Sequence, residues 1–253
     1  MMSKKSKSHA RHRARQVLKP HPLLEHQHST SSSWVAKIIT LFPDMFPGTL
    51  DYSVLGRALR ENIWSMEVIN LRDFGVGKHK DVDDTPSGGG PGMIIKPDII
   101  DLALQKLKGN ISPKIFLTPR GKLFNQKKAI ELSKNKGLDL ICGHYEGIDE
   151  RVIKFHQLEE VCIGDFVLSG GETAAIVLLD SVLRLLPSIL GGQRSLDEES
   201  FTDLPLLEYP QYTKPKTWKN LKVPNVLLSG NHKKIYAVSY THLRAHETRG
   251  NLV

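Results

Sequence analysis

The sequence predicts an α/β protein with a mostly parallel sheet and helices on both of its faces. From about residue 34 to residue 187, short apolar runs of strand length alternate with segments of helical periodicity. This alternation is typical of parallel sheets, because each crossover between parallel strands places a helix on one face. With 253 residues, 40% hydrophobic and 25% charged, the chain has the composition of a globular protein.

The individual elements follow from these patterns in chain order. A strand is expected in VAKIITLF, a helix in TLDYSVLGRALRE, a strand in MEVINL and a helix in PDIIDLALQKLK. The second half continues in the same way through the segments KIFLTP (114–119), AIELSKN (129–135), LDLIC (138–142), RVIKFHQ (151–157), VCIGDFVL (161–168) and AAIVLLDSVLRLLP (174–187).

The net charge of +8 lies mainly outside this pattern. Residues 1–33 contain seven lysine and arginine residues against one glutamate, and residues 34–236 are left with about +1. Bulk electrostatics therefore does not predict that the folded part binds nucleic acid. Residues 1–33 also lack hydrophobic periodicity, which predicts a disordered basic extension, with an organelle transit peptide as the alternative.

The two cysteines and the longest apolar runs exclude other classes of protein. Cys142 and Cys162 lie in predicted buried strands and have no zinc-type spacing with histidine, so we expect core thiols in a reducing compartment and no metal site. No apolar run reaches the 18 residues of a membrane span, so no membrane partner is expected.

Two glycine-bearing turns carry the strongest functional signal. CGHYEGIDER (142–151) follows LDLIC, and IGDFVLSGGE (163–172) follows LEEVCI. Both turns are expected at the carboxyl ends of neighbouring strands, where open α/β sheets bind ligands. Glycine there lets the main chain approach a flat ligand closely, although ordinary strand-to-helix turns are also rich in glycine.

A third glycine-rich segment, VDDTPSGGGPGM (82–93), fits neither common nucleotide-binding motif. It has no Lys-Ser/Thr ending and no G-x-G-x-x-G spacing, which excludes a P-loop and a Rossmann fingerprint. We interpret it as a flexible lid or base-binding loop. Asp83 and Asp84 are candidates for Mg²⁺ or a guanine edge, but an aspartate pair before a glycine turn is more often turn chemistry.

Read in order, the segments LFPDMF, GGGPGM, YEGIDERV, GDFVLSGGE, LLEYPQYTKP and VPNVLLSGNH resemble bacterial tRNA (guanine-N1)-methyltransferases, knotted methyltransferases of the SPOUT class. The resemblance covers about residues 34–235. It implies a C-terminal trefoil knot, S-adenosylmethionine as methyl donor, tRNA as substrate, and a cytoplasmic homodimer whose active site is shared between subunits. Mg²⁺ stays open as a further cofactor.

The resemblance also assigns roles to residues. Glu199, where many relatives have Asp, falls at the position of the general base, and Arg184 falls at the cation that faces guanine O6. Substrate contacts are implied for Asp83, Gly89, Gly90, Pro91, Gly92 and Met93. Donor binding is implied for Leu117, Thr118, Pro119, Gly143, Tyr145, Gly147, Ile163, Gly164, Asp165, Phe166, Val167, Leu168, Gly170 and Gly171.

The resemblance further divides the chain. The expected parts are the extension (1–33), the knotted domain (34–195), a linker (196–212), the start of a small helical tRNA-binding domain (213–235) and an adaptor-like tail (236–253). Because that helical domain is incomplete, a donor- or RNA-binding form without turnover is one alternative function. Another RNA methyltransferase of the same class is the second.

Overall fold

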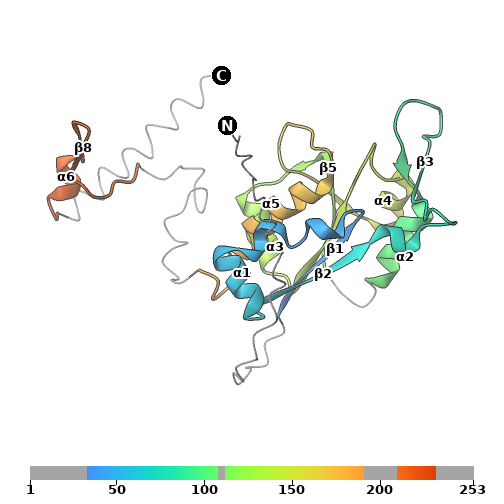
Figure 1. The fold of residues 1–253 in the computed structure, drawn as a ribbon, viewed down its shortest axis with the longest axis horizontal. Coiled ribbons are helices and arrows are strands. Elements are labelled where there is room, and N and C mark those ends of the chain that lie inside the picture. The colour runs from blue at the N-terminus through green and yellow to red at the C-terminus, as the bar shows by residue number, and fades with distance from the viewer. Residues whose placement is uncertain (1–32, 108–111, 191–209, 232–253) are drawn as a thin grey trace, which may run out of the picture. The chain divides into compact units, whose positions relative to one another are not determined.

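The computed structural model describes residues 33–107, 112–190 and 210–231. Its centre is a parallel five-stranded sheet with the strand order β2-β1-β6-β5-β7. The strands span β1 (Trp34–Thr40), β2 (Trp64–Asn70), β5 (Lys114–Leu123), β6 (Gly137–Cys142) and β7 (Glu159–Cys162). Figure 1 shows this sheet with helices on either side, which confirms the α/β class and the parallel sheet.

Two separate apolar cores lie on the two faces of the sheet. Ala36 and Ile38 of β1 belong to one core and Ile39 to the other, as expected for a strand whose side chains alternate between faces. The first core contains buried residues of α1 (Ser53–Arg60), α3 (Gln126–Ser133) and α5 (Gly171–Leu183). The second contains those of α2 (Pro97–Lys106) and α4 (Glu150–His156).

Short elements complete the described chain. The 3-10 helices are η1 (Pro43–Met45), η2 (Gly48–Asp51) and η3 (Leu71–Phe74). The strands β3 (Asp83–Asp84) and β4 (Ile94–Ile95) form an antiparallel pair around the glycine-rich loop. Residues 210–231 contain a second antiparallel pair, β8 (Thr217–Trp218) and β9 (Leu221–Lys222), and the single-turn helix α6 (Asn225–Leu228).

Side-chain caps set the starts of two helices that border the sheet. The Asn125 side chain accepts a hydrogen bond from the backbone N–H of Lys128 at the start of α3, and Asp149 accepts one from Arg151 at the start of α4. Each cap satisfies a backbone donor that the helix itself leaves unpaired. The α4 cap therefore fixes the point at which the first glycine-bearing turn ends.

Three expected elements have different bounds in the structure. The helix expected over 49–61 is divided into η2 and α1 by Tyr52, whose backbone is extended. A Cβ at Gly56 would lie 1.8 Å from the carbonyl oxygen of Asp51, so only glycine allows α1 to pack this closely against η2. The strand expected over VCIGDFVL ends at Cys162, while β5 continues past Pro119 to Leu123 because it pairs with β7 a second time after a register shift.

Candidate functional site

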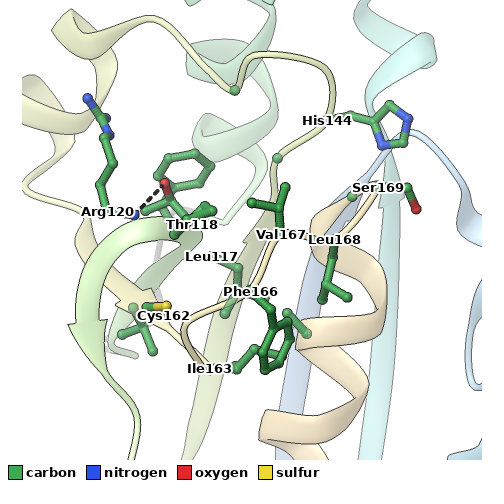
Figure 2. Close-up of a pocket in the computed structure, with 18 of the residues that line it drawn as sticks. Leu117, Thr118, Arg120, His144, Cys162, Ile163, Phe166, Val167, Leu168 and Ser169 are labelled. Atoms are coloured by element: carbon green, nitrogen blue, oxygen red, sulfur yellow. Dashed lines mark hydrogen bonds between the residues drawn. The ribbon is translucent and has the colours of Figure 1, made fainter.

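A cavity of about 280 Å³ lies between the middle of β5 and the carboxyl ends of β6 and β7. Its walls come from three segments far apart in the sequence, 116–120, 143–147 and 161–171, together with Ala174 of α5. Figure 2 shows labelled residues of these segments around one space, with Thr118 and Arg120 from the first and Val167 and Leu168 from the third.

The strand order explains why these segments meet. We expected the two glycine-bearing turns to follow neighbouring strands, and this is wrong, because β5 lies between β6 and β7. The central position of β5 makes its residues 116–120, where the pairing with β7 shifts register, the third wall. The two turns still touch across it: Gly171 N donates a hydrogen bond to Gly143 O at 2.8 Å, and His144 forms a β-bridge with Gly170.

The cavity gathers almost all of the residues that the sequence proposed for donor binding. Asp165 is the exception: it is exposed and does not line the cavity. Thirteen proposed residues line it, namely Leu117, Thr118, Pro119, Gly143, Tyr145, Gly147, Ile163, Gly164, Phe166, Val167, Leu168, Gly170 and Gly171. The proposed set omitted eight further lining residues: Phe116, Arg120, His144, Glu146, Val161, Cys162, Ser169 and Ala174.

The omitted lining residues carried a partial signal in the sequence. Glu146 and Ser169 lie inside the motifs YEGIDERV and GDFVLSGGE, and His144 directly precedes the first of these, so the motifs pointed to these three residues. Ala174 carried no such signal. It reaches the cavity only because α5 begins at the wall, so that its first turn faces the space.

The glycines of the two turns leave room for aromatic rings. A Cβ at Gly143 would lie 2.9 Å from the Phe116 ring, and a Cβ at Gly164 would lie 2.3 Å from the Phe166 ring. A larger residue at either position would displace a wall of the cavity first. The glycines therefore shape the cavity through the neighbouring rings as well as by close backbone approach.

Several apolar side chains at the cavity are left uncovered by the described chain. Tyr145 is 46% exposed, Phe166 55%, Val167 84% and Leu168 37%. Together they form an apolar mouth around backbone amides and carbonyls. Such a combination of apolar walls and a few polar groups is typical of pockets that bind a flat organic ligand.

The glycine-rich hairpin docks onto the same turn that lines the cavity. Glu146 N donates to Met93 O at 3.0 Å, and Ile95 N donates to Gly147 O at 3.0 Å. A Cβ at Gly92 would lie 2.5 Å from the Glu146 side chain, so glycine is needed for this close approach. The proposed substrate residues Gly92 and Met93 thus lie next to the cavity.

The other proposed substrate residues lie along the same hairpin. Gly89 and Gly90, whose φ angles are positive, form its exposed turn with Pro91, and Asp83 pairs with Ile95 at its base. The neighbouring Asp84 accepts a hydrogen bond from Thr85 N, which is turn chemistry. In the described ranges, no group of three or more His, Cys, Asp or Glu side chains has the arrangement of a metal site.

Of the two proposed catalytic residues, the structure describes only Arg184. Glu199 lies outside the described residues. Arg184 follows the last residue of α5, a helix of 13 residues whose first residue lines the cavity. At 1.5 Å per residue, this places the Arg184 backbone roughly 20 Å along the helix from Gly171 and about 15 Å from Ala174, which also lines the cavity. Within one chain, Arg184 does not belong to the cavity wall.

A buried carboxylate lies beside the cavity at the start of α5. Glu172 is 2% exposed and accepts a hydrogen bond from the Thr40 hydroxyl at 2.7 Å. Its position in the first turn of α5 places the negative charge where the helix dipole favours it. Burial, and to a lesser extent the charge of Glu172, raises the pKa of the Cys142 thiol, so Cys142 stays protonated as a core residue.

Comparison with known proteins identifies the family. The model of the family "tRNA (Guanine-1)-methyltransferase TrmD" matches residues 35–253. A tRNA (guanine-N(1)-)-methyltransferase of Pelagibacter ubique is 54% identical over 202 residues, which are 80% of this chain and 88% of the relative. Proteins of the same name from Jannaschia sp. and Ruegeria sp. are 49% and 50% identical, each over about four fifths of this chain and 85% and 84% of their own lengths. The chain therefore belongs to the TrmD family of tRNA (guanine-1)-methyltransferases.

Proposed function

We propose that this protein uses S-adenosylmethionine to methylate N1 of a guanine in tRNA, at the guanosine immediately 3′ of the anticodon. Membership of the family supports the reaction. The observation that carries the proposal is the three-segment cavity, because its lining contains almost every residue that the family resemblance assigns to the donor.

The residues of the cavity fit this donor. Uncovered apolar side chains, Tyr145, Phe166 and Leu168 among them, suit the faces of an adenine ring, and the adjacent backbone groups suit its polar edge. When bound, S-adenosylmethionine supplies an electrophilic methyl group. The protein then has to hold the ring, orient the methyl group towards guanine N1 and exclude water.

Removing the N1 proton requires a base and a cation. Glu199 is proposed to accept the N1 proton as general base, and the Arg184 guanidinium to stabilise the negative charge that spreads to guanine O6. In one chain Arg184 lies about 15 Å along α5 from Ala174, the nearest residue of that helix that lines the cavity. This separation supports a homodimer in which a second copy completes each site.

Three further properties are proposed from the family. We propose a trefoil knot, which membership of the family supports. We propose that residues beyond 212 begin a small helical domain that grips tRNA, and that the hairpin holds the target base. The described chain has no helix that is long and apolar enough to cross a membrane. We propose the cytoplasm, which the tRNA substrate and the two buried free cysteines suit.

Methylation of a full tRNA transcript tests the proposal. Incubation with S-adenosylmethionine is expected to add one methyl group, which mass spectrometry maps to N1 of the guanosine 3′ of the anticodon. The E199Q variant keeps the shape of the side chain but cannot accept the proton, so its single-turnover rate is expected to fall roughly 100-fold while donor affinity persists. Methylation at another atom would contradict the proposed methylation site. Donor binding without turnover, with or without Mg²⁺, would instead support an impaired form.

A further inference from the structure

A closed ring of contacts links the cavity to the buried carboxylate at the start of α5. The Thr40 hydroxyl accepts a hydrogen bond from Phe42 N at 2.9 Å and donates one to Glu172 Oε1 at 2.7 Å. The Phe42 ring lies 4.9 Å from the His144 ring, and His144 Nδ1 lies 3.9 Å from Glu172 Oε2. Thr40, Phe42, His144 and Glu172 thus form one cluster, and His144 is its member that lines the cavity.

One buried polar atom of this cluster lacks a hydrogen-bond partner among the described residues. His144 Nδ1 is buried and has no hydrogen-bond partner within the part of the chain that the structure describes. Its closest acidic atom, Glu172 Oε2, is 3.9 Å away, which is too long for a hydrogen bond. A buried carboxylate oxygen and a buried ring nitrogen that face one another at this distance both gain if the gap closes.

The surrounding backbone keeps this gap free of other atoms. A Cβ at Gly170 would lie 2.5 Å from both Glu172 Oε2 and His144 Nδ1. Any other residue at 170 would therefore intrude between the carboxylate and the ring. Gly170 also forms the β-bridge with His144, so the second turn holds the first turn in place beside α5.

The ring of His144 is also fixed from its faces. The Tyr145 ring lies edge-on to it at 4.9 Å, and the Phe42 ring is tilted against it at 4.9 Å. Tyr145 itself has a positive φ of 56° and is 46% exposed at the cavity mouth. The position of the Tyr145 ring therefore depends on where the His144 ring lies.

We propose that His144 and Glu172 form a positioning pair for the donor cavity. Thr40 fixes Glu172, and Glu172 holds the imidazole of His144 through a hydrogen bond from Nδ1 that closes when the donor binds. The imidazole in turn fixes the turn 143–147 and the Tyr145 ring against the ligand. This inference rests on the proposed donor function of the cavity.

Two substitutions at His144 separate the donor atom from the ring. H144F keeps a ring of similar size against Phe42 and Tyr145 but removes the Nδ1 donor. H144N removes the ring but places an amide N–H close to the position of Nδ1. The affinity for S-adenosylhomocysteine, measured by calorimetry, is expected to fall about 10-fold for H144F, since the lost bond is to a charged group, and to recover to within about 3-fold of wild type for H144N.

A double-mutant cycle tests whether Glu172 is the partner. E172M removes the acceptor with a side chain of similar length, at the cost of leaving the Thr40 hydroxyl without the acceptor it has in the wild type. E172M and the double variant H144F/E172M are both expected to bind as weakly as H144F, within about 2-fold, because either substitution breaks the same bond. Losses of affinity that add up in the double variant would overturn the pairing. If E172M does not fold, the comparison of H144F with H144N still decides the proposal.

A second histidine–carboxylate pair provides the matched control. His156 Nε2 of α4 lies 2.7 Å from Asp101 Oδ1 of α2, and neither residue lines the cavity. H156F is expected to leave affinity for S-adenosylhomocysteine unchanged, and thermal unfolding checks that each variant folds. Wild-type protein that binds no donor would refute the proposed function and the pair with it. A different outcome would overturn the pair alone. In it, the wild type binds donor and methylates tRNA, but H144F keeps full affinity or H156F loses affinity.

Discussion

Buried carboxylates at the carboxyl and amino ends of the parallel strands differ in their hydrogen bonding. At the carboxyl ends, Glu172 has a hydrogen bond from Thr40, the last residue of β1, and a histidine nearby. Towards the amino ends, Asp139 of β6 is completely buried, and neither of its carboxylate oxygens has a hydrogen-bond partner among the described residues. Lys37 of β1 and Lys114 of β5 are its neighbours in the sheet register.

This difference shows in the ionisation of Asp139. Burial raises the pKa of Asp139 to about 6, and the charges of Lys114 and Lys37 only partly oppose that effect. A buried carboxylate with long-range charges but no hydrogen bonds costs stability when it ionises. The carboxyl ends of the strands therefore carry a built site, while the amino ends carry a charge that the fold tolerates.

The largest expected effect comes from a substitution at the backbone contact between the two turns. In G171V, the added Cβ would lie 2.8 Å from Cys142 Cα and 2.9 Å from Gly143 N, both of them backbone atoms that cannot swing aside. The hydrogen bond from Gly171 N to Gly143 O would have to break. Affinity for S-adenosylhomocysteine, measured by calorimetry, is expected to fall by about 100-fold or more, with a loss of thermal stability.

Gly77 supplies the control for that substitution. It has a φ of +78° and nothing within 4 Å of an added Cβ, and it does not line the cavity. G77A is expected to cost about 1 kcal/mol of stability from backbone strain alone and to leave donor affinity unchanged. Equal donor affinities for G171V and G77A would show that the contact between the turns does not shape the cavity.

An intermediate effect is expected at the opposite ends of the strands. D139N removes the ionisation of Asp139 and is expected to raise the free energy of unfolding at pH 7 by about 1 to 2 kcal/mol. Chemical denaturation at several pH values measures this difference. Donor affinity is expected to stay unchanged, because Asp139 does not line the cavity.

The sign of the pH dependence follows from the raised pKa. Asp139 titrates at about 6 in the folded protein and at about 3.9 in the unfolded chain, so the folded state binds this proton more tightly. The contribution of Asp139 to the free energy of unfolding of the wild type is fully present below pH about 4. It is lost as the pH rises through about 6. D139N is expected to lack that decline. An identical decline in wild type and D139N would assign it to other groups.

The smallest expected effect is at the cavity mouth. F166A removes an exposed ring that lines the cavity, so donor affinity is expected to fall about 5-fold through lost contact area. The melting temperature is expected to change little, because a ring that is 55% exposed contributes little to the core. A large loss of stability with full donor affinity would show that Phe166 supports the fold and does not contact the donor.

The sequence by itself determined the class of the fold and, through the resemblance of its motifs, most members of the cavity. Apolar runs alternating with helical periodicity were enough to place β1, β2, α2, β6 and α5 within a few residues, since burial on both faces of the sheet leaves a plain pattern. Thirteen of the proposed donor residues line one cavity, because their segments fall in the middle of β5 and directly after β6 and β7.

Only the tertiary structure decided how those segments meet. The strand order puts β5 between β6 and β7, and pairing between strands depends on contacts that no local pattern encodes. For the same reason the sequence overlooked His144 and Glu172, whose relation to Thr40 spans more than 100 positions of the chain. The resemblance also placed Arg184 among the catalytic residues, whereas in one chain the structure puts it at the opposite end of α5 from the cavity.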